Sequence, residues 1–294
     1  MNLGLVNLDT SHVIAFTEAI TSDPAYADLR VTHAWRGESH VRGAADIEAY
    51  ALKLRDAFGV TLVDDLAELV DAVDAALIEA NEGARHLAQA APFLRAGKRC
   101  WVDKPLAATA DDARRILALA AEHGTSVFSA SALRYAPEVA AVAALDQPVL
   151  GADVITPAPQ HWANPGLLHY GIHGVEILLA LLGPDCVQVS CVRGADGEVC
   201  TGLWADGRLG TLRAAHGGPH LYALRVVLGG ERTGLHEVRL GLQDIYRPLL
   251  AQVALFLRGG VSPLTPDAMV ATIAFCEAAR ESARLGGAPV RLGP

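Results

Sequence analysis

The residues of this 294-residue sequence that are best suited to chemistry are a lysine before a proline and two histidines four positions apart. Lys104 follows the apolar run Arg99–Val102, and the chain has three lysines against twenty-one arginines. A partly desolvated lysine can exchange a proton, which arginine does not do at ordinary pH. Lys104 is therefore a candidate catalytic residue, and the alternative is a solvated surface lysine.

His169 and His173 are followed by Glu176, so on one helix the three side chains would share a face. Two imidazoles and a carboxylate suit general acid–base catalysis, with His173 and His169 as the catalytic pair. The spacing is also typical of zinc sites, and a third interpretation is a hydrogen-bonded group at a domain interface. The candidate substrate-binding residues are Arg134, Tyr135, His161, Trp162, Tyr170 and Glu176.

The N-terminal turn lies where a dinucleotide pyrophosphate would bind, between an apolar run and a helical pattern. It reads Asn7-Leu8-Asp9-Thr10-Ser11-His12 and lacks the three glycines expected there. Asparagine tolerates a left-handed backbone, so the turn can still form. However, Asp9 places a carboxylate near the phosphate position and could cap the helix itself. Either the Thr10 and Ser11 hydroxyls contact phosphate, or the helix is capped and binds no ligand.

Further candidate cofactor contacts follow the other predicted strands. Arg36 stands where an acid usually holds the ribose; it is compatible with the 2′-phosphate of NADP, and a surface arginine is the alternative. The sequence therefore leaves NAD and NADP open, and it predicts no metal. The predicted cofactor contacts are Asn7, Asp9, Thr10, Ser11, His12, Arg36, Glu79, Asn81, Asp103 and Lys104.

The elements that must position these groups fall into two patterns. Residues 1–130 alternate buried apolar runs with helical patterns, which predicts a doubly wound parallel sheet, a Rossmann-like dinucleotide-binding domain. In residues 131–294 a helix is expected over 167–182, and tight-turn signals separate clustered strands. This second part predicts an α+β domain with an open, mainly antiparallel sheet that serves substrate binding and oligomerisation.

The bulk composition excludes several classes of protein. The net charge of −9 argues against a nucleic-acid partner, and no apolar run reaches the length of a membrane span. The N-terminus lacks the basic segment of a signal peptide, and the five cysteines form no CxxC pair. These features predict a cytoplasmic protein with free thiols.

Taken together, the motifs resemble the Gfo/Idh/MocA family of oxidoreductases. Asp103-Lys104-Pro105 is similar to the family's Glu-Lys-Pro, and His86 stands where the family has a histidine seventeen residues upstream. Residues 134–137 resemble its Arg-aromatic-x-Pro, and residues 169–176 its Asp-x-Gly-x-His-x-x-Asp. The resemblance implies a Rossmann domain, an open-faced sheet domain, and a homodimer or homotetramer. It also implies Lys104 and His173 as catalytic residues, with His169 in place of the family's aspartate.

The leading hypothesis is an NAD(P)-dependent oxidoreductase that acts on a sugar, inositol or similar polyol. It requires Lys104 and His173 to converge on one cleft. One alternative is a non-redox ligand-binding or regulatory relative, which the missing glycines and Asp9 favour. Another is a metal-dependent lyase or hydrolase that uses His169, His173 and Glu176.

Overall fold

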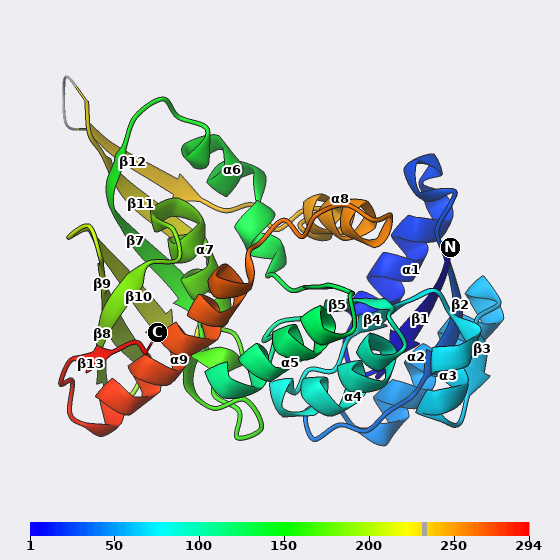
Figure 1. Ribbon diagram of the computed structural model, residues 1–294. Coiled ribbons are helices and arrows are strands. Elements are labelled where there is room, and N and C mark those ends of the chain that lie inside the picture. Colours follow the sequence, from blue (N-terminus) through cyan, green and yellow to red (C-terminus); the bar gives the residue numbers. More distant parts are fainter. Residues whose placement is uncertain (231–233, 294) are drawn as a thin grey trace. The chain divides into compact units, whose positions relative to one another are not determined.

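Alternating strands and helices build the first part of the chain, in a computed structural model that describes residues 1–230 and 234–293 (Figure 1). The strands are β1 (Asn2–Val6), β2 (Arg30–Trp35), β3 (Thr61–Val63), β4 (Ala75–Ile78), β5 (Arg99–Val102) and β6 (Val127–Phe128). The helices are α1 (His12–Ser22), α2 (Ala44–Phe58), α3 (Leu66–Ala72), α4 (Gly83–Arg95) and α5 (Ala110–Glu122). All strand pairs are parallel, in the order β3-β2-β1-β4-β5-β6, so the predicted doubly wound sheet is confirmed.

The register of this sheet brings the predicted cofactor residues to one edge. Val6 pairs with Trp35 and with Ile78, and Ile78 pairs with Val102. The residues that come next are Asn7, Arg36, Glu79 and Asp103, at matching positions where each strand ends. Carboxyl ends of parallel strands are where open α/β sheets bind ligands.

The second part of the chain forms a mixed sheet in which only β10 and β7 are parallel among the described strands. Its strands are β7 (Val149–Pro157), β8 (Cys186–Arg193), β9 (Gly197–Trp204), β10 (Leu209–Ala215), β11 (Ala223–Leu228), β12 (Gly234–Arg239) and β13 (Val290–Arg291), in the order β12-β11-β7-β10-β9-β8-β13. The helices are α6 (Pro137–Ala143), α7 (Ile172–Leu182) and α9 (Pro266–Arg284), with 3-10 turns at Ala132–Tyr135 and Gly166–Leu168. The predicted α+β sheet class is confirmed.

The two faces of this mixed sheet differ in cover. α7 packs against β7 and β10, and α9 lies over β8, where the amide of Cys191 donates to Ser282 Oγ. On the opposite face Ile155, Leu209 and Val192 are exposed, at 40%, 53% and 64%. This outer face carries exposed apolar side chains beside charged ones such as Asp153 and Arg225.

Residues 249–266 join the first unit rather than the second, although the sequence placed all of 131–294 in one domain. They hold most of α8 (Tyr246–Leu257). The Phe256 ring lies 5.8 Å from that of Phe128, and the Arg99 guanidinium stacks 5.1 Å from it. Arg99 Nη1 also donates to the carbonyls of Phe256 and Gly260, at 2.7 and 2.6 Å. Aromatic packing and buried carbonyl acceptors thus hold a late segment on the early sheet.

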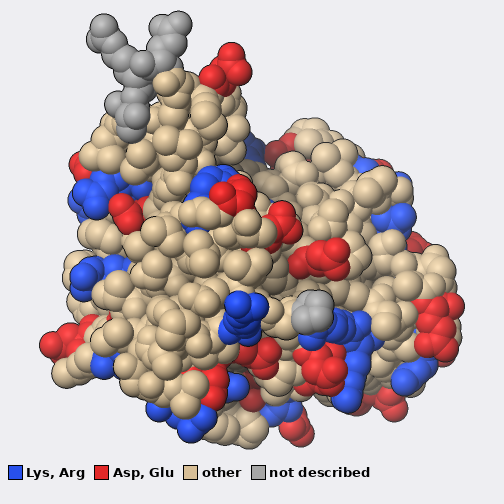
Figure 2. Space-filling model, turned by 60° about the vertical axis from the view of Figure 1, so that its left-hand side comes forward, with Lys and Arg blue, Asp and Glu red and all other residues tan. Residues whose placement is uncertain are grey.

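The charged side chains on the face drawn in Figure 2 do not separate by sign. On the face drawn in Figure 2, basic and acidic side chains are interspersed among uncharged ones. Among the described residues, no helix has both the length and the apolar character needed to cross a bilayer.

Candidate functional site

The turn between β1 and α1 replaces glycine with asparagine. Asn7 adopts a left-handed backbone with φ of 71°, as its residue type predicts. Its side-chain Oδ1 accepts from the Glu38 amide and from Gln89 Nε2, both at 3.1 Å. A Cβ at Gly37 would lie 1.9 Å from this oxygen, so the Asn7 side chain fills the space beside that glycine. The turn is therefore fixed by hydrogen bonds.

Asp9 is fully buried and does not cap α1, so that part of the prediction was wrong. Its Oδ1 accepts the amide of Asn81 at 3.0 Å, and Asn81 Nδ2 donates to the Asp9 carbonyl. Its Oδ2 has no hydrogen-bond partner among the described residues. Ser11 is the N-cap of α1 and makes no side-chain capping bond, while Thr10 Oγ1 accepts weakly from the His12 amide at 3.4 Å. The start of α1 carries no acidic residue.

Asp103 links the end of β5 to α1. Its Oδ2 lies 2.7 Å from His12 Nδ1, and its Oδ1 accepts the amide of Lys104 at 2.7 Å. Burial favours the neutral acid, but the charges of His12 and Lys104 hold the pKa of Asp103 below its usual value. Both carboxylate oxygens of Asp103 therefore have a hydrogen-bond partner.

Lys104 precedes Pro105 through a cis peptide bond. Burial lowers the pKa of Lys104, and the carboxylates of Asp103 and Asp9 oppose that shift. The fully buried His86 bridges the segments that follow β4 and β5. Its Nδ1 lies 2.8 Å from the Pro105 carbonyl oxygen, and its Nε2 lies 2.8 Å from the Ala80 carbonyl oxygen. Lys104 is thus desolvated, as its position between the strand β5 and Pro105 suggested.

Glu79 is fully buried between Asn7 and Asp103, and neither of its carboxyl oxygens has a partner among the described residues. Burial, followed by the charges of Asp103 and Asp9, raises its pKa well above the usual value. Arg36, which follows β2, makes two hydrogen bonds to Glu48 of α2, at 2.8 and 3.3 Å. Its guanidinium is therefore already paired.

In the second unit His173 is positioned by a serine that the sequence did not single out. Ser131 Oγ and His173 Nδ1 are 2.6 Å apart, and the same hydroxyl accepts the amide of Leu133 at 3.1 Å. Glu176 does not orient His173: Arg134 Nη1 donates to its Oε2 at 3.0 Å. Burial raises the pKa of Glu176, and Arg134 opposes the shift.

His169 and His173 do not share a helix face, because α7 begins at Ile172. Gly171 is the N-cap, and a Cβ there would come within 2.5 Å of Leu167. Gly171 therefore packs closely against Leu167 at the start of the helix. The expectation of one helical face over residues 169–176 was therefore wrong.

Ring contacts nevertheless bring several predicted residues together. His169 contacts His161 at 5.3 Å and Tyr170 at 5.0 Å between ring centroids, and Tyr170 contacts His173 at 5.7 Å. Two residues outside the predicted set join them: His220 contacts Tyr170, and the buried Tyr222 contacts His173. Trp162 stacks on His161, and its side chain is 71% exposed. Tyr135 is partly buried, and burial raises the pKa of its hydroxyl.

The metal hypothesis loses its ligand set. His173 is bound to Ser131 and Glu176 to Arg134, and the part of the chain that the structure describes contains no group of three metal-binding side chains with suitable geometry. These contacts argue against the metal-dependent lyase or hydrolase.

Comparison with known proteins matches part of the chain to one family. Residues 25–131 match the family described as "Oxidoreductase family, NAD-binding Rossmann fold", which is the Gfo/Idh/MocA family. A putative oxidoreductase, YceM, of Salmonella typhimurium is 30% identical over 159 residues, which are 51% of this chain and 50% of that protein. Inositol 2-dehydrogenase of Agrobacterium fabrum is 32% identical over 132 residues, 41% of this chain and 39% of that protein.

The chain thus matches at most about half the length of these curated Gfo/Idh/MocA relatives. Among solved structures, GenD2 from gentamicin A biosynthesis in complex with NAD has a TM-score of 0.81 at 20% identity. The match covers 100% of this chain and 97% of that one. This likeness shows a shared fold.

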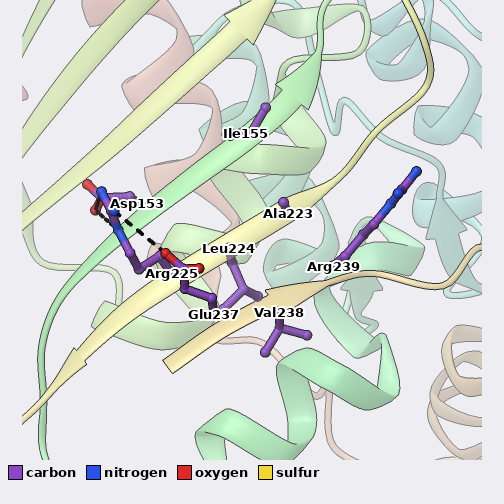
Figure 3. Close-up of a pocket in the computed structure, with 8 residues that line it drawn as sticks. All are labelled: Asp153, Ile155, Ala223, Leu224, Arg225, Glu237, Val238 and Arg239. Atoms are coloured by element: carbon purple, nitrogen blue, oxygen red, sulfur yellow. Dashed lines mark hydrogen bonds and ion pairs between the residues drawn. The ribbon is translucent and has the colours of Figure 1, made fainter. Parts of the chain in front are cut away.

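A pocket of about 390 Å³ lies on β7, β11 and β12, and none of the predicted site residues lines it (Figure 3). Arg225 pairs there with Asp153 at 3.1 Å and with Glu237 at 3.7 Å, beside the apolar Ile155 and Val238. It belongs to the outer face of the mixed sheet, so it adds nothing to the chemistry of the strand-end residues.

Proposed function

We propose that the protein is an NAD-dependent oxidoreductase that transfers hydride between nicotinamide and a hydroxyl-bearing carbon of a sugar, inositol or similar polyol. The match of residues 25–131 to an NAD-binding oxidoreductase family supports the reaction class. The partial likeness to inositol 2-dehydrogenase supports the substrate class. The observation that carries the proposal is the strand-end row of Asn7, Glu79 and Asp103, which is followed by a desolvated lysine.

The residues of the first unit fit a dinucleotide. Asn7 supplies the left-handed turn, Asp9 is directed to Asn81, and α1 begins without a capping side chain or an acidic residue. A helix start of this kind offers amide donors to a phosphate. Thr10, Ser11 and the first turn of α1 would hold the pyrophosphate.

The paired Arg36 favours NAD over NADP. Its guanidinium is held by Glu48, and Asp64 adds a second negative charge in its surroundings. A 2′-phosphate would have to displace Glu48 and would approach its carboxylate, which costs electrostatic energy. The ribose hydroxyl of NAD brings no such charge.

Each unit contributes one chemical role. When bound, nicotinamide supplies the carbon that exchanges hydride. In the first unit the Lys104 ammonium stabilises negative charge on the substrate oxygen. In the second unit His173 removes the hydroxyl proton through Nε2, while Nδ1–H donates to Ser131 Oγ. That hydroxyl has two lone pairs, so it can also accept the Leu133 amide.

We also propose a cytoplasmic homodimer or homotetramer that associates through the outer face of the mixed sheet, with no nucleic-acid or membrane partner. The exposed Ile155, Leu209 and Val192 support self-association, and five free, buried cysteines support a reducing compartment. Sedimentation of the wild type and of Leu209→Asp tests the interface; identical profiles would contradict it.

The test of function is titration with NADH and NADPH, followed by substrate-dependent reduction of NAD. We expect NADH to bind more tightly than NADPH, and Lys104→Met to lose turnover while it keeps NADH binding. Absence of binding at millimolar concentrations of either cofactor, with the fold intact, would favour the non-redox relative. The buried Asp9 carboxylate is the observation behind that alternative.

A further inference from the structure

Three buried carboxyl groups meet at the edge where the proposed function places a dianionic pyrophosphate. Asp9 and Glu79 are fully buried and Asp103 is 2% exposed. The charged groups that act on Glu79 are Asp103, after β5, and Asp9, after β1. His12 on α1 and Lys104 act in turn on Asp103. Three ionised carboxylates here would oppose an anionic ligand and one another.

The contacts decide which carboxyl groups hold their charge. Asp103 accepts from the Lys104 amide and is bound to His12. Asp9 accepts from the Asn81 amide. Glu79 has neither a cation nor an amide donor among the described residues. Ile78 of β4 pairs with Val102 of β5, so Glu79 and Asp103 occupy neighbouring positions at the ends of these strands. An unpaired buried acid in such a place normally takes up a proton.

A neutral Glu79 changes what the edge can bind. Its hydroxyl proton is a donor, and the described residues offer it no acceptor. A buried donor without an acceptor is costly, so a ligand that supplies one gains affinity. Phosphate and carboxamide oxygens of a nicotinamide dinucleotide are acceptors of this kind.

We propose that Glu79 is kept as the neutral acid at the carboxyl edge of the parallel sheet, and that its proton is a hydrogen-bond donor to the bound dinucleotide. The inference rests on the proposed function for its ligand, but not for the charge state. It removes one of the three negative charges that the buried carboxyl groups could otherwise present to a pyrophosphate at this edge. Glu79 is a binding residue here and takes no part in hydride transfer.

The charge state is tested without cofactor by infrared difference spectroscopy of the wild type against Glu79→Gln. We expect a protonated-carboxyl band at pH 7 in the wild type that the substitution removes. Glu18→Gln, at an exposed position of α1, is the matched control and should leave the band unchanged. A wild-type spectrum without this band means that Glu79 is ionised, and the inference is then wrong.

The ligand role is tested by NADH titration over a range of pH. Once the pH exceeds the pKa of Glu79 in the free protein, the wild-type Kd should rise about tenfold per pH unit. The affinity of Glu79→Gln for NADH should depend little on pH, and at high pH it should exceed the affinity of the wild type. A variant that loses binding at every pH would overturn the ligand role, because the amide keeps a donor. If neither protein binds NADH or NADPH, the proposed function fails with the ligand role, and the infrared band still decides the charge state.

Discussion

Replacing Glu79 by glutamine should stabilise the folded protein at neutral pH. In the unfolded chain a glutamate ionises with a pKa of about 4.3. Folding raises the pKa of Glu79 through burial and the charges of Asp103 and Asp9. Between the unfolded and folded pKa values the folded state therefore binds the additional proton, and the free energy of unfolding falls as the pH rises. Glutamine has nearly the same shape and no proton to take up.

The magnitude follows from the proton alone. Each pH unit above about 4.3 costs the wild type about 1.36 kcal/mol, so the cost at pH 7 reaches at most about 3.7 kcal/mol. No discount for solvent applies, because Glu79 is fully buried. Near pH 4 both states of the wild type are protonated, and the two proteins should be equally stable.

Urea unfolding followed by circular dichroism, repeated between pH 4 and pH 8, measures this difference. We expect the stability gap between Glu79→Gln and the wild type to widen with rising pH. Glu18→Gln is the control for removing one acidic side chain at an exposed position. A gap that stays constant over this range would refute the reasoning, since the variant would then differ for a reason unconnected with proton uptake.

Three further substitutions test the cofactor edge, the second unit and the packing of α8. Glu48→Ala should release Arg36 and lower the Kd for NADPH at least about tenfold without weakening NADH; fluorescence titration checks this, and unchanged NADPH affinity would contradict the role of the pair. Ser131→Ala should reduce kcat by on the order of tenfold to a hundredfold and shift the pH–rate profile, while Ser131→Thr restores both; an unaltered profile would mean that the hydroxyl does not position His173. Phe256→Ala should destabilise the first unit by about 3–5 kcal/mol in thermal unfolding, and a loss below about 1 kcal/mol would show that its ring contacts are replaceable.

Periodicity and turn residues were enough to predict the parallel sheet and the second, mixed sheet, because each strand was bounded by its own local signal. β3 and α3 were missed since three and seven residues are too short to show a period. The helix expected over 167–182 begins at Ile172, after a separate 3-10 turn at Gly166–Leu168, and hydropathy does not distinguish the two elements.

The site was harder to predict where partners are far apart in sequence. Asp9 looked like a helix cap from its local position, but its partner, Asn81, lies seventy-two residues away. Ser131 and His173 are separated by forty-two residues and share no motif. Arg36 was read as a potential phosphate ligand because Glu48 becomes its neighbour only when α2 folds against β2. In each case the residue type was informative, and its partner was set by tertiary structure.

The return of residues 249–266 to the first unit means that no single cut separates the two units as intact pieces. A fragment that ends at residue 130 would lack α8, so the Phe128 ring would lose its aromatic neighbour and Arg99 its carbonyl acceptors. During synthesis the packing of the first unit is complete only after residues 249–266 have been made. Fusions or domain exchanges with this protein therefore need three junctions, one near residue 130 and a pair that preserves residues 249–266.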